Sequence, residues 1–160
     1  MKYPQSKARI LAALSCQLEK FQIPELIYFT VENWEENEKK IIQKISQKFS
    51  KTKIAIRSSA ADEDKINNSG AGQYESVLNV VSADSENIRS AVESVIKSYK
   101  RPADFKASDE ILIQAMMQGT IMSGVVFTHD LNSGAPYYVI NYDDISGLTN
   151  TVTSGEGEHA

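Results

Sequence analysis

An arginine and two serines stand at the end of a short apolar run, and the residues that follow are small and polar. Residues 54–80 read IAIRSSAADEDKINNSGAGQYESVLNV. Side chains alternate between the two faces of an extended strand, so Arg57 is expected on the face opposite to Ile54 and Ile56. A guanidinium can hold phosphate oxygens through two parallel hydrogen bonds, and Ser58 adds a hydroxyl donor. This pattern indicates an anion-binding group at the tip of a strand.

The small residues further along the same stretch suit a loop that covers an anion. Gly70, Ala71 and Gly72 would let the backbone come close to a phosphate group, because little side chain intervenes. The alternative is a solvated surface loop in which Arg57 pairs with Glu63 or Asp64. The stretch matches neither the phosphate-binding loop of P-loop proteins nor the dinucleotide-binding fingerprint. The residues by themselves leave both interpretations open.

Composition limits the possible partners and the compartment. The chain has 160 residues, enough for one domain with a hydrophobic core. Seventeen basic against twenty-one acidic residues give a net charge of −4, which argues against nucleic acid and anionic membranes as partners. Cys16, expected to pack in the first helix, is the one cysteine, so no internal disulfide can form. With no signal-peptide pattern and no apolar run of membrane-spanning length, we expect a cytoplasmic protein.

Hydrophobic periodicity predicts three helices and six strands. The first helix is expected from Ser6 to Phe21, and the second from Thr30 or Asn33 to about Phe49. The third is expected to begin at Asp84 or Ser85 and to reach Tyr99. The expected strands are ELIYFT, residues 52–57, SVLNVV, EILIQAMM, SGVVFT and YYVINY. Because the helices come early and the strands dominate the last third, the pattern favours an α+β fold.

The stretch from Arg57 to Val80 resembles the nucleotide-binding domain of the phosphoenolpyruvate synthase (pyruvate, water dikinase) and pyruvate phosphate dikinase family. The family pattern is Arg-Ser-Ser-Ala, two residues, Glu-Asp, a small-residue loop ending in Ala-Gly-Gln, and a strand with Leu-Asn-Val. The matching residues are Arg57, Ser58, Ser59, Ala60, Glu63, Asp64, Ala71, Gly72, Gln73, Leu78, Asn79 and Val80.

Three further segments resemble the family in the expected order. SKARILAAL resembles its Gly-x-Lys-Ala segment, with Ser6 where glycine is commoner. ILIQAMM resembles the strand beside the adenine, and SGVVFTHDLNSG resembles the Ser-Gly-Val-x-Phe-Thr-Arg-Asp segment, with His129 in the arginine position. The resemblance covers about residues 5 to 155 and implies an ATP-grasp-like α+β subdomain. Residues 1–160 would then form part of an ATP-binding domain.

The resemblance also implies a set of site residues for ATP. Lys7 and Arg57, the expected catalytic residues, would contact the ATP phosphates, although a lysine at a helix start is more often solvated. The remaining expected nucleotide-binding residues are Ser58, Gly72 and Gln73 near the phosphates, and Gln114, Ala115 and Met116 beside the adenine. Plain core packing is the alternative for the methionines.

A magnesium ligand is expected near the last strand. Family members commonly carry a glutamate where this chain has Asn141, and an amide is a weaker magnesium ligand than a carboxylate. Asp143 or Asp144 could substitute for that glutamate, and the alternative is a turn with two solvated aspartates. The histidine that relays phosphate in the family belongs to another domain, so His129 is given no catalytic role.

In the family, ATP gives its β-phosphoryl group to that histidine, which leaves AMP and phosphate, and a pyruvate-binding barrel receives the group. The 160 residues include neither the phosphohistidine domain nor the barrel, so the chain by itself is expected to be inactive and to bind ATP weakly or not at all. A dikinase with another acceptor is one alternative. A non-catalytic nucleotide-binding module, suggested by Asn141, is a second, and a plain α+β scaffold is a third.

Overall fold

The structure is a computed structural model of the 160-residue chain. It describes residues 6–50, 52–60, 75–99, 106–146 and 152. The chain divides into two compact units, Met1–Met116 and Met117–Ala160. The expected phosphate-covering loop, with Gly72 and Gln73, lies outside the described residues, as do Glu63 and Asp64.

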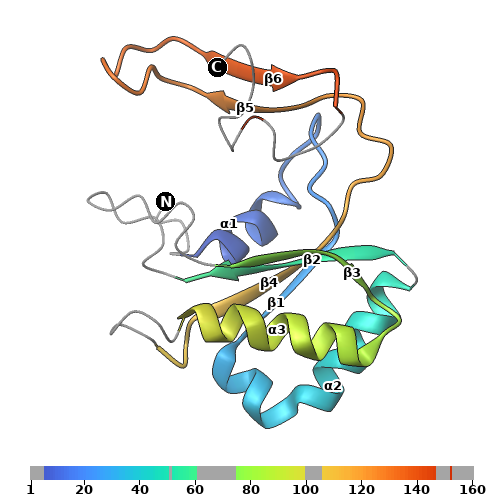
Figure 1. The fold of residues 1–160 in the computed structure, drawn as a ribbon. Coiled ribbons are helices and arrows are strands. Elements are labelled where there is room, and N and C mark those ends of the chain that lie inside the picture. Colours follow the sequence, from blue (N-terminus) through green and yellow to red (C-terminus); the bar gives the residue numbers. More distant parts are fainter. Residues whose placement is uncertain (1–5, 51, 61–74, 100–105, 147–151, 153–160) are drawn as a thin grey trace. The chain divides into compact units, whose positions relative to one another are not determined.

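The first unit is a four-stranded antiparallel sheet with helices on both faces (Figure 1). Its strand order is β1-β4-β2-β3, so β4 and β2 are the central strands. Helices α2 and α3 cover one face, and the short helix α1 lies on the other (Figure 1). The elements are α1 (Lys7–Leu14), β1 (Leu26–Thr30), α2 (Val31–Phe49), β2 (Lys53–Ser59), β3 (Ser76–Val81), α3 (Ser85–Tyr99) and β4 (Glu110–Ala115).

The core lies between the sheet and the helices α2 and α3. Each helix turns one apolar stripe toward the sheet, as the sequence predicts, and the full burial of an aliphatic side chain contributes about 1.5–3 kcal/mol. The buried stripes are Trp34, Ile41, Ile42, Ile45 and Phe49 on α2, and Ile88, Val92, Val95, Ile96 and Tyr99 on α3. They pack against Ile54 and Ile56 of β2 and Ile111 and Ile113 of β4. The predicted α+β class is therefore confirmed.

Side-chain caps explain why α2 and α3 begin where they do. The Oγ1 atom of Thr30 accepts a hydrogen bond from the backbone N–H of Asn33 at 3.1 Å. The Oδ1 atom of Asp84 accepts from the N–H groups of Glu86 and Asn87, each at 3.1 Å. These bonds satisfy donors that have no partner inside a helix.

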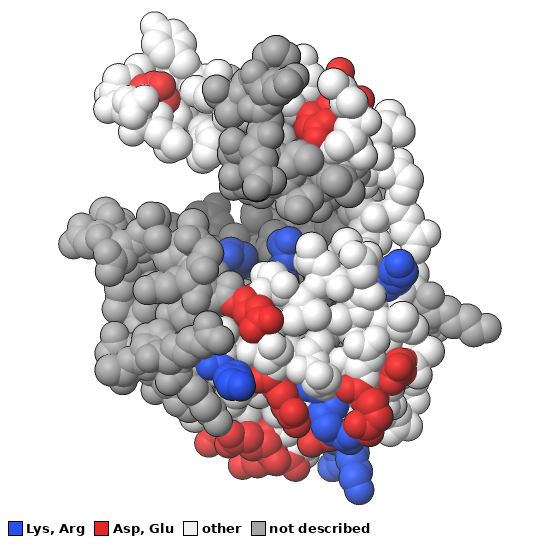
Figure 2. All heavy atoms as spheres, viewed as in Figure 1, with Lys and Arg blue, Asp and Glu red and all other residues white. Residues whose placement is uncertain are grey.

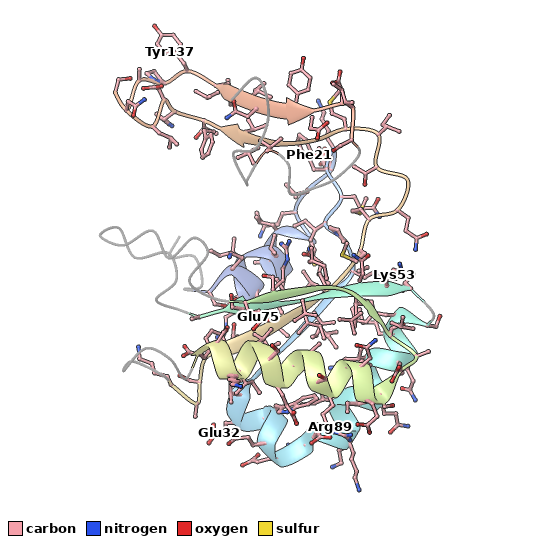
Figure 3. All side chains as sticks on the ribbon, viewed as in Figure 1. Phe21, Glu32, Lys53, Glu75, Arg89 and Tyr137 are labelled. Carbon is pink, nitrogen blue, oxygen red and sulfur yellow. The ribbon has the colours of Figure 1, made fainter. Side chains whose placement is uncertain are left out.

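Charged side chains are mixed in sign where α2 and α3 meet solvent (Figure 2). Arg89 of α3, labelled in Figure 3, donates from Nε to Glu38 of α2 at 2.6 Å and also pairs with Glu86. These carboxylates raise the pKa of Arg89, with the hydrogen bond that Arg89 donates to Glu86 as the largest cause. Both pairs are partly exposed, and such pairs contribute little to stability.

The first helix is shorter than predicted. It ends at Leu14 instead of Phe21, and its C-cap is Ser15. The hydroxyl of Ser15 donates to the carbonyl of Ala12 at 2.7 Å, which competes with continuation of the helix. Phe21 is 76% exposed, so the later part of the helical pattern is not buried against the described residues. Cys16 is exposed as well, so the expectation that it packs in this helix is wrong.

A β-bulge lies in β3 where the sequence reads Leu-Asn-Val. Ile54 pairs with Val80 and Ile56 with Val77, so two residues of β3 stand opposite one residue of β2. One of these two, Asn79, has a φ of 61°, in the left-handed region that asparagine and glycine adopt more readily than other residues. Asn79 therefore matches the backbone conformation that the bulge requires.

Replacing Asn79 by alanine is expected to lower the free energy of unfolding by about 1 kcal/mol, because a Cβ-bearing residue without a local hydrogen-bonding group is strained at positive φ. Asn79→Gly is the matched control and should leave stability within about 0.5 kcal/mol of wild type. Urea denaturation followed by circular dichroism measures both variants. Equal losses for alanine and glycine would show that the asparagine side chain, and not the backbone angle, matters.

The second unit contains one hairpin, β5 (Ser123–Phe127) paired with β6 (Val139–Asp143). The strand predicted at YYVINY begins at Val139, and Tyr137 and Tyr138 precede it with exposed rings. Gly124 of β5 allows a close approach, because a Cβ built there would lie 2.6 Å from the carbonyl oxygen of Asn141. None of the helices in the described residues has the length and apolar character needed to cross a membrane.

Candidate functional site

Arg57 lies in the middle of the sheet, on the face that carries α1. It is a residue of β2, and its register partners are Leu112 of β4 and Ser76 of β3. The buried Ile54 and Ile56 point toward α2 and α3. Strand alternation therefore places Arg57 on the α1 face, as the sequence predicts.

The guanidinium of Arg57 has one buried donor that is not satisfied. Its Nε atom is buried and has no hydrogen-bond partner among the described residues. A buried donor without a partner costs about 1–3 kcal/mol, so unsatisfied donors are rare in folded proteins. The chemistry of this group suits an anionic acceptor such as a phosphate oxygen.

Gln114 lies on the same sheet face as Arg57. It pairs with Ala55 of β2, one alternate position away from the pair formed by Arg57 and Leu112. Residues two apart on a strand share a face, so Gln114 and Arg57 are diagonal cross-strand neighbours. Gln114 and Ala115 are half-buried at the end of β4, and Met116, directly after it, is half-buried too. The structure therefore brings together the expected phosphate-binding arginine and the first expected adenine-binding residue.

The first turn of α1 is fixed to the ends of both central strands. The backbone N–H of Ala8 donates to the Oγ atom of Ser59 at 2.9 Å. The hydroxyl of Ser6 donates to the Glu110 carboxylate at 2.5 Å, and Arg9 Nε donates to its other oxygen at 2.6 Å. Glu110 raises the pKa of Arg9 above its usual value, chiefly through this hydrogen bond.

Lys7 is held within this docked turn. It is the first residue of α1, it is half-buried, and it precedes Ala8, whose N–H is bonded to Ser59. Ser59 stands two residues beyond Arg57 on the same strand face. The backbone of Lys7 is thus anchored at the end of the strand that carries Arg57.

A tyrosine closes the same corner from the other side of the sheet. The Tyr99 hydroxyl, from the end of α3, donates to the carbonyl oxygen of Glu110 and accepts from the N–H of Ser59, both at 2.5 Å. Tyr99 is 1% exposed. Strand β2, strand β4 and two helices therefore meet at the Ser59–Glu110 pair.

Two of the expected nucleotide-binding features look different in the structure. Ser58 is buried and alternates with Arg57, so its side chain belongs to the face of α2 and α3, whereas Ser59 lies on the α1 face. The N–H of Ala115 donates to the backbone carbonyl oxygen of Glu25, and the N–H of Met116 donates to that of Lys53, each at 2.9 Å. Reading of an adenine edge by these two N–H groups would therefore break sheet hydrogen bonds.

Asn141 and Asp143, the expected magnesium ligands, lie on one face of β6 in the second unit. They are two residues apart in the strand, and their partners in β5 are Val125 and Ser123. Asp143 Oδ1 accepts from the N–H groups of Ile145 and Ser146 at 2.8 and 2.9 Å. Within the described ranges, no group of three or more histidine, cysteine, aspartate or glutamate residues could hold a metal ion.

The turn between β5 and β6 is organised by Asp130, which follows His129. Asp130 Oδ1 accepts from the N–H and the hydroxyl of Ser133, both at 2.7 Å. These hydrogen bonds hold the pKa of Asp130 below its ordinary value, with the Ser133 hydroxyl as the largest cause. His129 Nδ1 lies 3.1 Å from the hydroxyl of its neighbour Thr128. Asp130 thus has a local structural role in this turn.

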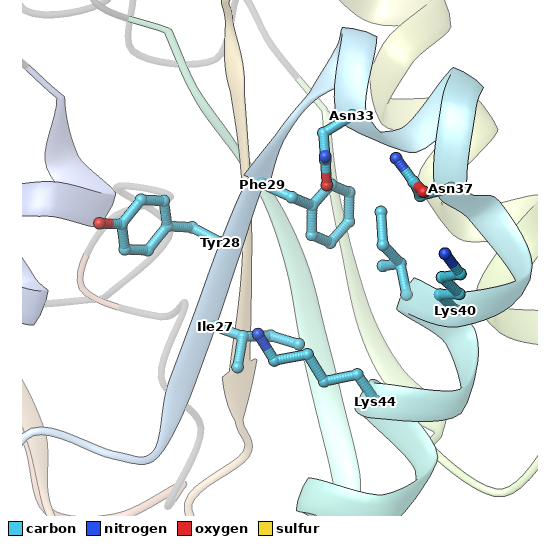
Figure 4. A pocket seen from close by; sticks show the side chains of 8 residues that line it. Ile27, Tyr28, Phe29, Asn33, Asn37, Lys40 and Lys44 are labelled. Carbon is cyan, nitrogen blue, oxygen red and sulfur yellow. The ribbon is translucent and has the colours of Figure 1, made fainter.

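A hollow of about 180 Å³ lies elsewhere, between β1 and α2 (Figure 4). Tyr28 projects to the other side of β1 in this view. The hollow lies on the face of the sheet that carries α2, whereas Arg57 lies on the α1 face. Its lining residues are Ile27, Tyr28, Phe29, Asn33, Asn37, Lys40, Ile41 and Lys44. None of the expected site residues lines it.

Sequence reasoning missed the two residues that dock α1. Glu110 belongs to no recognised motif, and Arg9 lies in the SKARILAAL segment without being one of its matched residues. The two lie 101 positions apart in the chain. The one available signal was a glutamate at the start of an otherwise apolar strand, a position where burial demands a partner.

Comparisons with known proteins indicate the family of the chain. The family described as pyruvate phosphate dikinase, AMP/ATP-binding domain, matches residues 20–157, which leaves α1 outside the matched range. The prodigiosin synthesizing transferase PigC of Serratia marcescens is 32% identical over an alignment of 111 positions, which covers 64% of this chain. The chain spans 12% of the length of that relative. On the match over most of its length, the chain belongs to the pyruvate phosphate dikinase AMP/ATP-binding domain family.

Proposed function

We propose that this chain binds ATP and forms part of a nucleotide-binding domain of a dikinase-type phosphotransferase. The observation that carries the proposal is Arg57, whose buried Nε has no partner among the described residues and lies on the sheet face shared by Gln114 and α1. A triphosphate supplies the acceptor oxygens that this donor lacks. The family membership supports an adenine nucleotide as the source of that anion.

The site residues divide by chemistry. Arg57 and Lys7 hold the phosphates, Arg57 as a planar fork and Lys7 as a point charge. Gln114 and Met116 border the adenine, and Gly72 and Gln73 belong to the loop that covers the phosphates. Phosphoryl transfer depends mostly on positioned phosphates and cationic groups that offset developing charge. In the complete protein, the β-phosphoryl group would pass to a histidine of another domain with AMP as the leaving group, and water would take the γ-phosphoryl group to release phosphate.

Mg²⁺ is part of this proposal, with Asp143 as the charged ligand and Asn141 as a weaker one. A bound magnesium ion would offset the negative charge of the phosphate groups. Two hard oxygen donors two residues apart on one strand face fit such an ion, although Asp143 would have to share its oxygens with Ile145 and Ser146.

A second candidate is a related phosphotransferase with an acceptor other than pyruvate. The similarity to a transferase that synthesizes prodigiosin favours it, as does Asn141 in the place of a glutamate. Both candidates share the same use of ATP and differ only in the acceptor. A cytoplasmic location is proposed with either, in keeping with the single free thiol of Cys16.

An NMR titration of the 160-residue chain with ATP, from micromolar to several millimolar, tests the proposal. We expect weak binding that shifts the amide signals of Lys7, Arg57 and Gln114, with a lower Kd when Mg²⁺ is present. GTP is the matched control, because it has the same phosphates and a different base. If signals along α2 shift instead, or if ATP and inorganic triphosphate give the same Kd, the proposed nucleotide site is wrong.

A further inference from the structure

We propose that Glu110 is a positioning residue that sets the distance between the two phosphate-binding cations, Lys7 and Arg57. This inference rests on the proposed function. Glu110 begins β4 and is 3% exposed, so its carboxylate requires compensation inside the protein. The compensation comes entirely from α1 in the described contacts of this side chain, through Ser6 and Arg9.

The two carboxylate oxygens of Glu110 accept hydrogen bonds from different residues. Oε2 accepts from the hydroxyl of Ser6, the N-cap of α1, and Oε1 accepts from Nε of Arg9. Ser6 and Arg9 flank Lys7 and Ala8, so one side chain holds both ends of the first turn. With both ends held, α1 can neither rotate about its axis nor slide along the sheet without breaking a charge-assisted bond.

The same corner also fixes the strand that carries Arg57. Ser59 is the register partner of Glu110, and its Oγ accepts the N–H of Ala8. The Tyr99 hydroxyl joins the N–H of Ser59 to the carbonyl oxygen of Glu110. The backbone positions of Lys7 and Arg57 are therefore both fixed by the Ser59–Glu110 pair, although the two residues lie 50 positions apart in the sequence.

Arg9 has a second consequence for an anionic ligand. A buried carboxylate close to a phosphate site would repel the phosphates, and Arg9 offsets its charge locally. Glu110 can therefore hold the helix without weakening phosphate binding. This predicts that the pair acts on the polyphosphate end of the nucleotide, and that recognition of the base is insensitive to it.

The test compares Glu110→Gln with Glu86→Gln. Glu86 also bonds an arginine, but on the exposed side of α3, so it controls for the loss of one charged hydrogen bond. Two quantities are measured by NMR: hydrogen exchange at the Ala8 amide without nucleotide, and the Kd values for ATP and for AMP. For Glu110→Gln, we expect the Ala8 exchange rate and the ATP Kd to rise about tenfold each. The AMP Kd should change less than about twofold, and Glu86→Gln should alter none of the three.

The outcomes separate this inference from the proposed function. If Glu110→Gln leaves the Ala8 exchange rate as in Glu86→Gln, Glu110 does not position α1, whether or not ATP binds. If ATP and AMP weaken equally, Glu110 is only structural, and the inference is overturned. If the wild-type chain binds ATP and AMP with the same Kd, the inference is overturned as well. The proposed function is judged separately, by the response of ATP binding to Arg57 substitution.

A conservative variant covers the case in which Glu110→Gln fails to fold, as judged by circular dichroism. Glu110→Asp keeps the charge and shortens the reach by one methylene. It should give a ratio of AMP Kd to ATP Kd between those of the wild type and of Arg57→Met. A ratio equal to the wild-type value would show that the position of the carboxylate does not matter.

Discussion

Replacing Arg57 by methionine is expected to raise the Kd for ATP by about 10- to 100-fold without lowering the stability of the nucleotide-free chain. A charge-assisted hydrogen bond contributes about 1.5–3 kcal/mol, and each 1.4 kcal/mol changes an equilibrium constant tenfold. The buried Nε has no partner among the described residues, so removal of the guanidinium abolishes an unsatisfied donor. Methionine keeps most of the aliphatic stem, so little packing is lost.

The changes in ATP Kd and in stability distinguish a binding role of Arg57 from a structural one. The free energy of unfolding should stay unchanged or rise by about 1 kcal/mol, as expected where a site residue carries strain for its ligand. NMR titration gives the Kd, and urea denaturation followed by circular dichroism gives the stability. A fall in stability of more than about 2 kcal/mol with ATP binding unchanged would assign Arg57 to the core.

Arg89→Met is the matched control for this experiment. Arg89 is also an arginine of the first unit, but it lies on α3 and its two partners are carboxylates of α2 and α3. Its loss should change the ATP Kd less than twofold and lower stability only slightly, because partly exposed ion pairs contribute little. A loss of ATP affinity in Arg89→Met equal to that in Arg57→Met would point to a general charge effect.

The helices that carry local signals could be predicted almost to the residue. Thr30 and Asp84 cap α2 and α3 through their own side chains, and the apolar stripes behind them match one helical face. Capping and periodicity are both encoded within a few residues, so the sequence alone suffices for such elements. The end of α1 was missed because the periodicity continues to Phe21, whereas Phe21 stays exposed among the described residues.

In the candidate site, local sequence pattern predicts less, because several contacts join residues that lie far apart in the chain. Alternation along β2 predicts the face of Arg57, but nothing in 160 residues of local pattern pairs Arg9 with Glu110. That contact depends on the register of β4 against β2 and on the placement of α1, which are properties of the whole sheet. Likewise, the hydrogen bonds that Asp143 makes to its own turn follow from backbone geometry after β6. The role of Asn141 and Asp143 as magnesium ligands stays a prediction.

The largest stability effect is expected from Trp34→Ala, which should lower the free energy of unfolding by about 3–5 kcal/mol. Trp34 is 4% exposed and stacks on Phe29 of β1, with ring centroids 5.7 Å apart and an interplanar angle of 19°. Its removal leaves a cavity where α2 joins the sheet edge and ends an aromatic contact. A loss of this size is a large part of the 5–15 kcal/mol by which domains are stable.

Two variants make the Trp34 experiment specific. Trp34→Phe keeps an aromatic ring against Phe29 and should recover at least half of the loss. Phe21→Ala removes an aromatic ring that is 76% exposed, and should change stability by no more than about 0.5 kcal/mol. Trp34 is the one tryptophan of the chain, so unfolding in urea is followed by circular dichroism and not by fluorescence.

Because Trp34 lies on the α2 face and Arg57 on the α1 face, a Trp34→Phe chain that remains folded should bind ATP with the wild-type Kd. An equal loss in Trp34→Ala and Phe21→Ala would instead mean that the packing of α2 on β1 does not limit the stability of the sheet on which the proposed site depends.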